Sequence, residues 1–524
     1  MAKASSRAPL LPLLPVLLLA WAWEADAALR VASYYGDHMV LQKEPSRAVI
    51  WGYKDADANA TVTVTISNNQ STLKKHTAEV EEKSKIWRVL LSPMAQGGPY
   101  NIEIQQAYKK GISNVTLKDV YFGDVWLCSG QSNMEMTVSQ IFNATEELKN
   151  ASDFPLVRVF AAAHVESVEE LQDLAGIQLN WSIPKAEILG HGDFSYFSAV
   201  CWLFGRYLFE KLNYPIGLIE SSWGGTPIET WSSKKALQDC GLSKRSENAR
   251  SSELISGPKE SSILWNAMIR PLVNMTIHGV IWYQGEANTV MNMDLYNCTF
   301  PALIDDWRKT FHEGSQRQTQ RYFPFGFVQL CTEHQLHPDD TFSVIRWHQT
   351  ADFGFVPNKK MPNTFMAVTI DLGDENSPYG SIHPRDKQSV AYRLYLGALA
   401  LAYAEKSTVF QGPYPQNIQV DVLHKNITVT YEESILLRNL DNKTFEVCCF
   451  SMETCKWNPV TMSSASSHTV ILRNVICPNT TVGLRYAWNE WPCQYRLCPL
   501  YNTQELPAPP FVLFSLNNPE WTVV

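Results

Sequence analysis

Residues 120–141 predict a strand, a sharp turn and a helix in immediate succession, and this arrangement constrains the fold more than any other part of the chain. The apolar run Val120–Leu127 suits a buried strand, and Gly130 allows the backbone to bend sharply before apolar residues recur at helical spacing. Ser132 is therefore expected at the start of a helix, with its hydroxyl exposed and its backbone N–H directed outward. An ordinary serine N-cap fits the same position, so this stretch alone leaves both interpretations open.

Strands and helices alternate from Val120 to Glu405, which predicts an α/β domain with a mostly parallel sheet and helices on both faces. In such sheets ligands meet the carboxyl ends of the strands, and Ser132 lies just past one of these ends. The predicted strands that follow are 215–223, 277–283, 324–330 and 364–372, and the predicted helices are 199–211, 296–311, 343–353 and 385–404.

Two β-rich regions flank this central domain, to which we assign residues 118–408. Short alternating segments separated by turn residues predict a small β-sandwich over residues 28–117 and a second β-domain, rich in cysteine, over residues 409–524. Residues 1–27 combine a basic start, a short apolar run and a small-residue exit, which indicates a signal peptide. Since no other long apolar run occurs, we expect no membrane span after its removal.

The composition excludes some partners and indicates an oxidising compartment. Lysine and arginine total 44 against 52 aspartate and glutamate residues, without basic clusters, so nucleic acid is not an expected partner. The eleven cysteines do not repeat a zinc pattern, and disulfides are expected instead. Because the total is odd, at least one thiol is left without a partner in the chain, and Cys128, in the strand before Ser132, is our candidate.

Three further groups of polar residues follow predicted strands. Gly224 and Gly225 form a turn whose backbone N–H groups can reach a developing oxyanion. Gln284, Glu286 and Asn288 follow the strand 277–283. His383 stands on a loop just before a helix, where it can act as a base toward a serine. Each group alone has an ordinary explanation as a turn, a loop network or a structural histidine.

Taken in order, Gly130-Gln131-Ser132-Asn133-Met134 and these later groups resemble the SGNH (GDSL-like) hydrolases, in the variant found in carbohydrate acetylesterases. The resemblance implies a three-layer, flavodoxin-like fold, with Ser132 as nucleophile and His383 as base. It also implies an oxyanion hole that includes Gly225 and Asn288, with Gln284 as a rival donor. His348 has no matching block in this family.

The sequence departs from the family pattern just before His383. The family commonly has aspartate three or two residues ahead of this histidine, whereas this chain has Gly380 and Ser381. Either a carboxylate from elsewhere orients the imidazole, or a backbone carbonyl does so in a Ser–His dyad, because tautomer control requires only a hydrogen-bond acceptor. The candidate carboxylates are Asp371, Asp374 and Glu286.

The resemblance extends over nearly the whole mature chain and is strongest to members that act on sialic acids. It implies a serine esterase that removes O-acetyl groups from sialic acids, free or on glycoconjugates and chiefly at the 9 position, through an acetyl-serine intermediate and without metal or cofactor. An acetylesterase of other glycans and a catalytically silent sugar-binding glycoprotein are the alternatives. Arg346, Arg385 and Lys387 are candidate partners for the sugar carboxylate, although solvated surface roles fit them equally.

Glycosylation sequons occur along the entire mature chain, which places every domain in the secretory pathway, with a lysosomal or secreted destination and an acidic optimum expected. The sequon asparagines are Asn59, Asn69, Asn114, Asn143, Asn150, Asn180, Asn274, Asn297, Asn426, Asn442 and Asn479.

Overall fold

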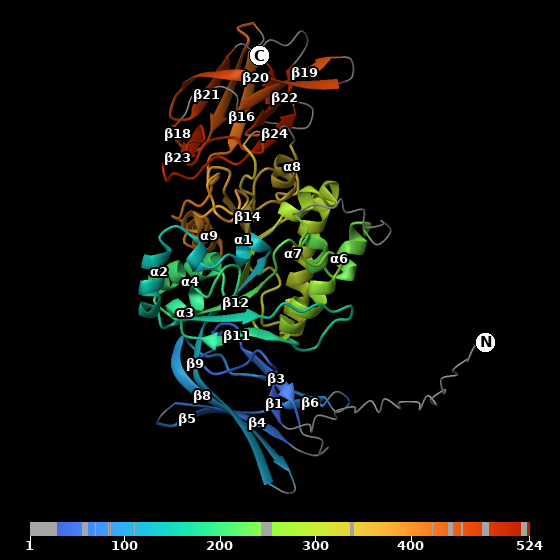
Figure 1. The fold of residues 1–524 in the computed structure, drawn as a ribbon, viewed down its shortest axis with the longest axis vertical. Coiled ribbons are helices and arrows are strands. Elements are labelled where there is room, and N and C mark those ends of the chain that lie inside the picture. Colours follow the sequence, from blue (N-terminus) through green and yellow to red (C-terminus); the bar gives the residue numbers. More distant parts are fainter. Residues whose placement is uncertain are drawn as a thin grey trace, which may run out of the picture.

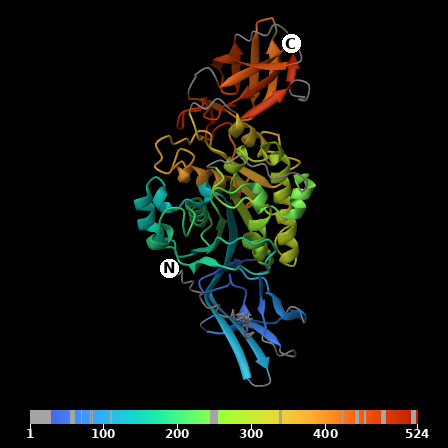
Figure 2. The same cartoon turned by 45° about the vertical axis from the view of Figure 1, so that its right-hand side comes forward.

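The computed structural model has a central α/β region between two β-rich regions that lie at opposite ends of the long axis (Figure 1). The same order along the axis is visible after rotation (Figure 2). The predicted signal peptide lies outside the described residues. The structure describes residues 29–523 except 55–60, 69, 82, 84, 109–110, 243–253, 336–339, 422, 439–443, 452–453, 474–480 and 515–520.

The central sheet has the strand order β11-β10-β12-β9-β13-β14-β15, and all neighbours pair in parallel except β10 and β11. Every residue of β10, β12, β13, β14 and β15 is buried. Such continuous burial is typical of a parallel sheet covered on both faces, and the prediction of a mostly parallel sheet is confirmed. The strands are β9 Gly111–Gly130, β10 Val157–Ala162, β11 Ile177–Ser182, β12 Ile216–Ser222, β13 Gly279–Tyr283, β14 Phe325–Gln329 and β15 Thr364–Val368.

Helices lie on both sides of this sheet (Figure 1). On one side α4 and α9 pack against each other and onto β12 and β15. On the other side α7 places Phe300 and Trp307 against aromatic rings of β13 and β14. The helices are α1 Ser132–Glu135, α2 Ala144–Asn150, α3 Ala186–Leu189, α4 Ala199–Leu212, α5 Ile228–Trp231, α6 Lys234–Asp239, α7 Tyr296–Gly314, α8 Thr341–His348 and α9 Lys387–Leu401.

The helix expected to run from Ser132 to Ile141 is much shorter than predicted. It ends at Glu135, because Met136 adopts an extended ψ of 131° and Thr137 forms an isolated bridge with Ser198. Short turns of 3-10 or π-helix occur here and later in the chain. They are η1 Val138–Gln140, η2 Ala151–Asp153, η4 Trp265–Ile269, η5 Arg270–Asn274, η6 Glu286–Thr289 and η7 Met293–Leu295.

The N-terminal β region is joined to the central sheet through β9. This strand pairs with β8 in its first part and with β12 and β13 in its last part, and it continues without interruption past residue 117. A separate sheet has the order β1-β3-β7-β6. The strands of this region are β1 Arg30–Val31, β2 Val40–Gln42, β3 Val49–Tyr53, β4 Val62–Ser67, β5 Thr72–Thr77, β6 Glu79–Glu81, β7 Ile86–Leu90 and β8 Gly97–Tyr108.

The C-terminal region is a sheet of order β24-β22-β19-β20-β21-β17-β16-β25, with a separate pair β18-β23. Its strands alternate between buried and less buried positions, as β17 shows, and this agrees with the predicted β-domain. The strands are β16 Pro415–Asp421, β17 Asn426–Tyr431, β18 Ile435–Leu437, β19 Phe445–Ser451, β20 Thr454–Ala465, β21 Thr469–Arg473, β22 Thr481–Tyr486, β23 Leu500–Asn502, β24 Phe511–Phe514 and β25 Trp521–Val523.

The predicted free thiol at Cys128 is wrong. Cys128 on β9 forms a disulfide with Cys201 on α4, because this helix packs over the strand and brings the two Cα atoms to 5.8 Å. Among the described cysteines, the free one is the buried Cys331, which follows β14. Further disulfides join Cys240 to Cys298, Cys448 to Cys455 and Cys493 to Cys498.

The predicted glycosylation sites fall into three groups. Asn59, Asn69, Asn442 and Asn479 lie outside the described residues. Asn114, Asn143 and Asn180 are exposed, and Asn150, Asn297 and Asn426 are half-buried. Asn274 is a correction, because it is only 4% exposed and its amide nitrogen is buried, so this fold leaves no room there for a glycan.

Candidate active site

Ser132 stands at the point where β9 turns into α1. Gly130 closes the strand with a φ of 145°, and a Cβ at this position would lie 2.1 Å from the carbonyl oxygen of Tyr283. Only glycine tolerates both this positive φ and the close approach of the Tyr283 carbonyl, so the tight turn follows directly from the sequence. Because β12 and β13 run parallel to β9 on either side, the residues after these strands lie at the same edge of the sheet as Ser132.

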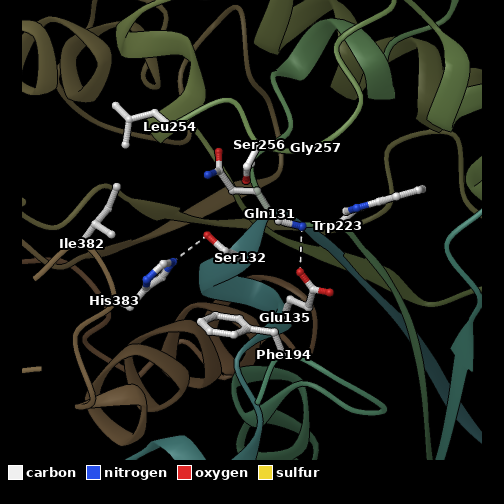
Figure 3. Close-up of a pocket in the computed structure, with 12 residues that line it drawn as sticks. Gln131, Ser132, Glu135, Phe194, Trp223, Leu254, Ser256, Gly257, Ile382 and His383 are labelled. Atoms are coloured by element: carbon white, nitrogen blue, oxygen red, sulfur yellow. Dashed lines mark hydrogen bonds between the residues drawn. The ribbon is translucent and has the colours of Figure 1, made fainter. Parts of the chain in front are cut away.

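His383 reaches Ser132 from the loop between β15 and α9 (Figure 3). Its Nε2 lies 2.8 Å from the Ser132 hydroxyl oxygen, and its Nδ1 lies 2.7 Å from the carbonyl oxygen of Tyr379. A carbonyl can only accept a hydrogen bond, so neutral His383 carries its hydrogen on Nδ1 and presents a bare Nε2 to the serine. The structure thus brings together Ser132 and His383, the two residues that the sequence singles out.

The pKa of His383 is lowered to about 4. Burial is the largest cause because it disfavours the charged imidazolium, and the positive charge of Lys387 adds to it. The hydrogen bond to the Tyr379 carbonyl acts in the opposite direction. The imidazole is therefore neutral, and able to accept a proton, throughout the mildly acidic and neutral range.

Each carboxylate considered as a possible orienter of His383 is held elsewhere. Asp371 pairs with Arg393 at 2.6 Å, and Asp374 pairs with Arg385 at 2.6 Å. Glu286 accepts a hydrogen bond from Asn133. The sequence left open whether a carboxylate or a backbone carbonyl orients His383. Among the described residues, the backbone carbonyl of Tyr379 is the acceptor that contacts its Nδ1.

The glycine turn after β12 lies beside Ser132. Gly225 has a φ of 65°, and together with Gly224 it lines a hollow that opens around Ser132. The N–H of Gly224 donates to Glu135 at 2.7 Å. Within the described part of the chain, the N–H groups of Gly225 and Ser132 have no hydrogen-bond partner. These two donors are therefore available to a ligand oxygen.

Asn288 and its rival Gln284 are not placed at this hollow. Both are fully buried, and the Asn288 amide group donates to Glu229 and to the carbonyl of Met291. Gln284 donates to Asn288 and to the carbonyl of Thr226. Their amide groups fix the loops behind the hollow instead of facing it, which corrects the predicted oxyanion role of Asn288.

Asn133 connects the nucleophile turn to the histidine loop. Its amide nitrogen donates to Glu286 at 2.6 Å and to the carbonyl of Ile382, the residue before His383, at 2.9 Å. Its amide oxygen accepts from Lys387 at 2.6 Å. These three partners come from two segments far from Asn133 in the chain, so one buried side chain fixes the position of His383 relative to Ser132.

The three cations considered for a sugar carboxylate are already engaged. Arg346 is fully buried and donates to four backbone carbonyls. Lys387 is fully buried against Asn133, and Arg385 forms a two-point ion pair with Asp374. These interactions correct the ligand role considered for the three residues.

The hollow around Ser132 has a volume of about 340 Å³, which lies within the usual range for small-molecule sites. The sequence assigns roles to Ser132, Gly224, Gly225 and His383 among its lining residues. Gln131, Trp223 and Ile382 stand in the same motifs without an assigned role, and no sequence signal singled out the other lining residues. We call this cavity the Ser132 hollow. It is lined by Gln131, Ser132, Glu135, Phe194, Trp223, Gly224, Gly225, Leu254, Ser256, Gly257, Ile382 and His383.

Glu135 holds the wall of the Ser132 hollow in place. Its carboxylate accepts from Gly224 and lies 3.2 Å from His164, whose ring stacks on Trp223. Below it, burial raises the pKa of Glu220 to about 8, and the nearby Glu135 charge adds to this rise. Glu220 is therefore neutral at acidic and neutral pH, which avoids a second negative charge under the turn.

Two family models match the chain. One describes a carbohydrate esterase, sialic acid-specific acetylesterase, and matches residues 122–378. The other describes a sialate O-acetylesterase C-terminal domain and matches residues 416–515. In the part of the chain that the structure describes, no helix is both long and apolar enough to cross a bilayer.

Individual proteins of the same family are similar to this chain over most of its length. The sialate O-acetylesterase of Homo sapiens is 54% identical over 505 residues, covering 96% of this chain and 95% of that protein. The Mus musculus sialate O-acetylesterase is 53% identical over 516 residues, covering 93% and 95%. A crystal structure of a carbohydrate acetylesterase from Xanthomonas citri superposes with a TM-score of 0.74 at 26% identity, covering 93% of this chain and 99% of that one. With matches over almost its whole length, the chain belongs to the sialate O-acetylesterase family of carbohydrate esterases.

Proposed function

We propose that this chain hydrolyses O-acetyl esters of sialic acids, chiefly 9-O-acetyl esters, free or on glycoconjugates. The observation that carries the proposal is the 2.8 Å contact between His383 Nε2 and the Ser132 hydroxyl at the wall of an open hollow. The names of the relatives support the choice of sialic acid as the acetylated sugar.

In the first half-reaction, His383 Nε2 removes the Ser132 proton while the hydroxyl oxygen bonds to the acetyl carbonyl carbon. The carbonyl oxygen becomes an oxyanion that accepts hydrogen bonds from the N–H groups of Gly225 and Ser132. The imidazolium then gives its proton to the departing sugar oxygen. The ester C–O bond breaks, and Ser132 keeps the acetyl group.

In the second half-reaction, water replaces the sugar. His383 takes a proton from this water as the water oxygen bonds to the acetyl carbon, and the protonated imidazole returns the proton to the Ser132 oxygen when the tetrahedral species collapses. Acetate and the free serine are the products. Throughout both steps the carbonyl of Tyr379 accepts from Nδ1 and stabilises the imidazolium, the part that a carboxylate has in a Ser–His–Asp triad.

The same proposal includes the domain organisation and the cellular location of the protein. It assigns residues 118–408 to an SGNH-like, three-layer catalytic domain, residues 28–117 and 409–524 to accessory β-domains, and residues 1–27 to a signal peptide. Disulfides in the central and C-terminal regions fit an oxidising compartment. The proposed locations are the lysosomal lumen and the exterior of the cell, with glycans on exposed sequons such as Asn114 and Asn180.

The first experiment compares wild type with Ser132→Ala and Ser139→Ala, using p-nitrophenyl acetate. Ser139 lies on the neighbouring η1, and its hydroxyl contacts Thr137 outside the Ser132 hollow, so it is a matched control. We expect hydrolysis to fall to background in Ser132→Ala and to persist in Ser139→Ala. Equal rates for wild type and Ser132→Ala would overturn the esterase proposal and favour a silent sugar-binding glycoprotein.

A second candidate is an acetylesterase of other acetylated glycans. The observation that favours it is that the described residues lining the Ser132 hollow include no lysine or arginine to pair with a sialic acid carboxylate. Incubation with 9-O-acetylated sialic acid beside acetylated neutral sugars separates the two. Faster release of acetate from the neutral sugars would replace the first candidate with the second.

A further inference from the structure

A second hollow, of about 220 Å³, lies where the loop after β15 meets residues 491–495. We call it the Trp491 hollow. The described residues that line it are all different from those that line the Ser132 hollow, and no step of the proposed reaction uses it. It is lined by Phe142, Gln335, Gly373, Asp374, Glu375, Asn376, Trp491, Gln494 and Tyr495.

One part of this lining is aromatic, with the rings of Phe142, Trp491 and Tyr495. The indole nitrogen of Trp491 is closed to solvent and has no hydrogen-bond partner among the described residues. The ring packs closely on Gly373, where a Cβ would lie 2.5 Å from Cζ2, so the side chain has little freedom to turn toward another acceptor. A ligand in the hollow can therefore contact the aromatic ring of Trp491 but not its N–H, and the apolar face of a sugar ring packs on such a surface.

The other part of the lining is polar, with groups suited to hydroxyls. The amides of Gln335, Asn376 and Gln494 each offer both donors and an acceptor. A sugar ring presents an apolar face together with hydroxyl groups around its edge. Aromatic rings combined with amide side chains match both of these features.

The charge of the Trp491 hollow selects among sugars. Its described lining contains the carboxylates of Asp374 and Glu375 and no lysine or arginine. The guanidinium of Arg385 pairs with Asp374 through bonds of 2.6 and 3.0 Å and covers the ring of Phe142, so it is committed to those two groups. The exposed Glu375 leaves the hollow with a negative charge that repels a sugar carboxylate.

The Trp491 hollow is built on the loop that carries the proposed base. Asp374 and His383 lie in the same connection between β15 and α9. Phe142 belongs to the segment after α1, and its N–H donates to the carbonyl of Arg385 at 3.1 Å. A ligand here would contact the same connection as the Ser132 hollow while leaving that hollow empty.

From this geometry we infer that the Trp491 hollow is a subsite for a neutral sugar unit, such as a hexose or an N-acetylhexosamine. The inference rests on the proposed function in one respect, because a glycan that carries an acetylated sialic acid also carries neutral sugars. It adds a second contact for such glycans, separate from the acetyl ester.

The test uses the full glycosylated chain with lactose as the probe, followed by saturation-transfer NMR and calorimetry. We expect saturable binding with a dissociation constant of about 1–10 mM, a weak affinity typical of small, solvent-exposed ligands. Trp491→Leu removes the aromatic ring that lines the hollow, and Gln494→Ala removes an exposed amide. Each variant should weaken binding by about tenfold, the effect of roughly one lost ring contact or one lost hydrogen bond.

Tyr322→Ala is the control, because Tyr322 is an exposed aromatic residue outside both hollows. It should bind lactose as wild type does, and all three variants should hydrolyse p-nitrophenyl acetate at the wild-type rate. The subsite is overturned if lactose does not bind, if Trp491→Leu and Gln494→Ala bind it normally, or if N-acetylneuraminic acid displaces it with equal affinity. Lactose binding by Ser132→Ala is independent of hydrolysis, so failure of the esterase proposal and failure of the subsite give different results.

Discussion

His383 is oriented by the backbone carbonyl of Tyr379, which lies 2.7 Å from Nδ1. A backbone carbonyl holds the same tautomer as a carboxylate but carries no full negative charge. It therefore provides less stabilisation for the imidazolium that forms during the reaction. This relationship explains how the chain can lack the aspartate that usually precedes the family's histidine.

The first prediction concerns Asp374, which among the three candidate carboxylates is the nearest in sequence to the position of the expected aspartate. Asp374→Asn keeps an acceptor for Arg385 and should lower kcat by less than about tenfold, since His383 does not depend on this side chain. In a Ser–His–Asp protease the corresponding change lowers kcat by about 10⁴. Steady-state kinetics with p-nitrophenyl acetate provide the measurement, and a loss of the larger size would show that Asp374 orients the base.

The second prediction is the pH dependence of kcat/KM. His383 acts only when neutral, and its pKa is lowered from 6.5 to about 4, so activity is retained as pH falls through 6.5 and is lost as pH falls through about 4. A histidine with its ordinary pKa would already be mostly protonated at pH 5. Initial rates between pH 3 and 8 locate the half-maximal point, and a midpoint near 6.5 would contradict the prediction.

The third prediction tests the glycine turn. Gly225→Ala should lower kcat by about 10²–10³, as loss of an oxyanion donor does, because the new Cβ would lie 2.3 Å from the Ser256 hydroxyl and displace the turn. Gly241→Ala is the matched control. Its φ of 77° imposes similar backbone strain, but nothing lies within 4 Å of the new Cβ. If both variants keep wild-type kcat, Gly225 has no part in stabilising the oxyanion.

The fourth prediction concerns the Asn133 connection. Asn133→Ala should lower kcat by about 10–100-fold with little change in KM, because the position of His383 relative to Ser132 loosens while the Ser132 hollow remains. Glu286→Gln should have a smaller effect, since the glutamine oxygen still accepts from Asn133. Parallel kinetics on the two variants check this order, and a larger loss in Glu286→Gln would point to a direct role for the carboxylate.

The fifth prediction concerns the disulfide between β9 and α4. Replacing Cys128 and Cys201 together by alanine should lower the free energy of unfolding by about 2–4 kcal/mol, because a long loop of the unfolded chain is no longer closed. Urea denaturation measures the change. Cys331→Ala removes the described free thiol as a control and should cost less, and an equal loss in both proteins would reject a special contribution from the disulfide.

Much of the fold could be predicted from local patterns. The strands β12 to β15 and the helices α4, α7 and α9 fall within a few residues of their predicted bounds, because apolar periodicity and turn residues are properties of neighbouring positions. Local patterns also predict too long a helix after Ser132, because they do not include contacts with distant parts of the chain. A tertiary bridge between Thr137 and Ser198 competes with helical continuation, and no local pattern reveals it.

By itself the sequence determined the turn at Gly130, because this turn depends on residue type within a short segment, and the family resemblance of its motifs singled out Ser132 and His383. Only the tertiary structure decided that a carbonyl orients His383, that Asn288 supports a loop, and that Cys128 pairs with Cys201. These outcomes depend on which groups meet across the packed sheet and helices. A buried polar side chain forms hydrogen bonds with the groups that the fold brings next to it. Those groups can lie hundreds of residues away in the chain.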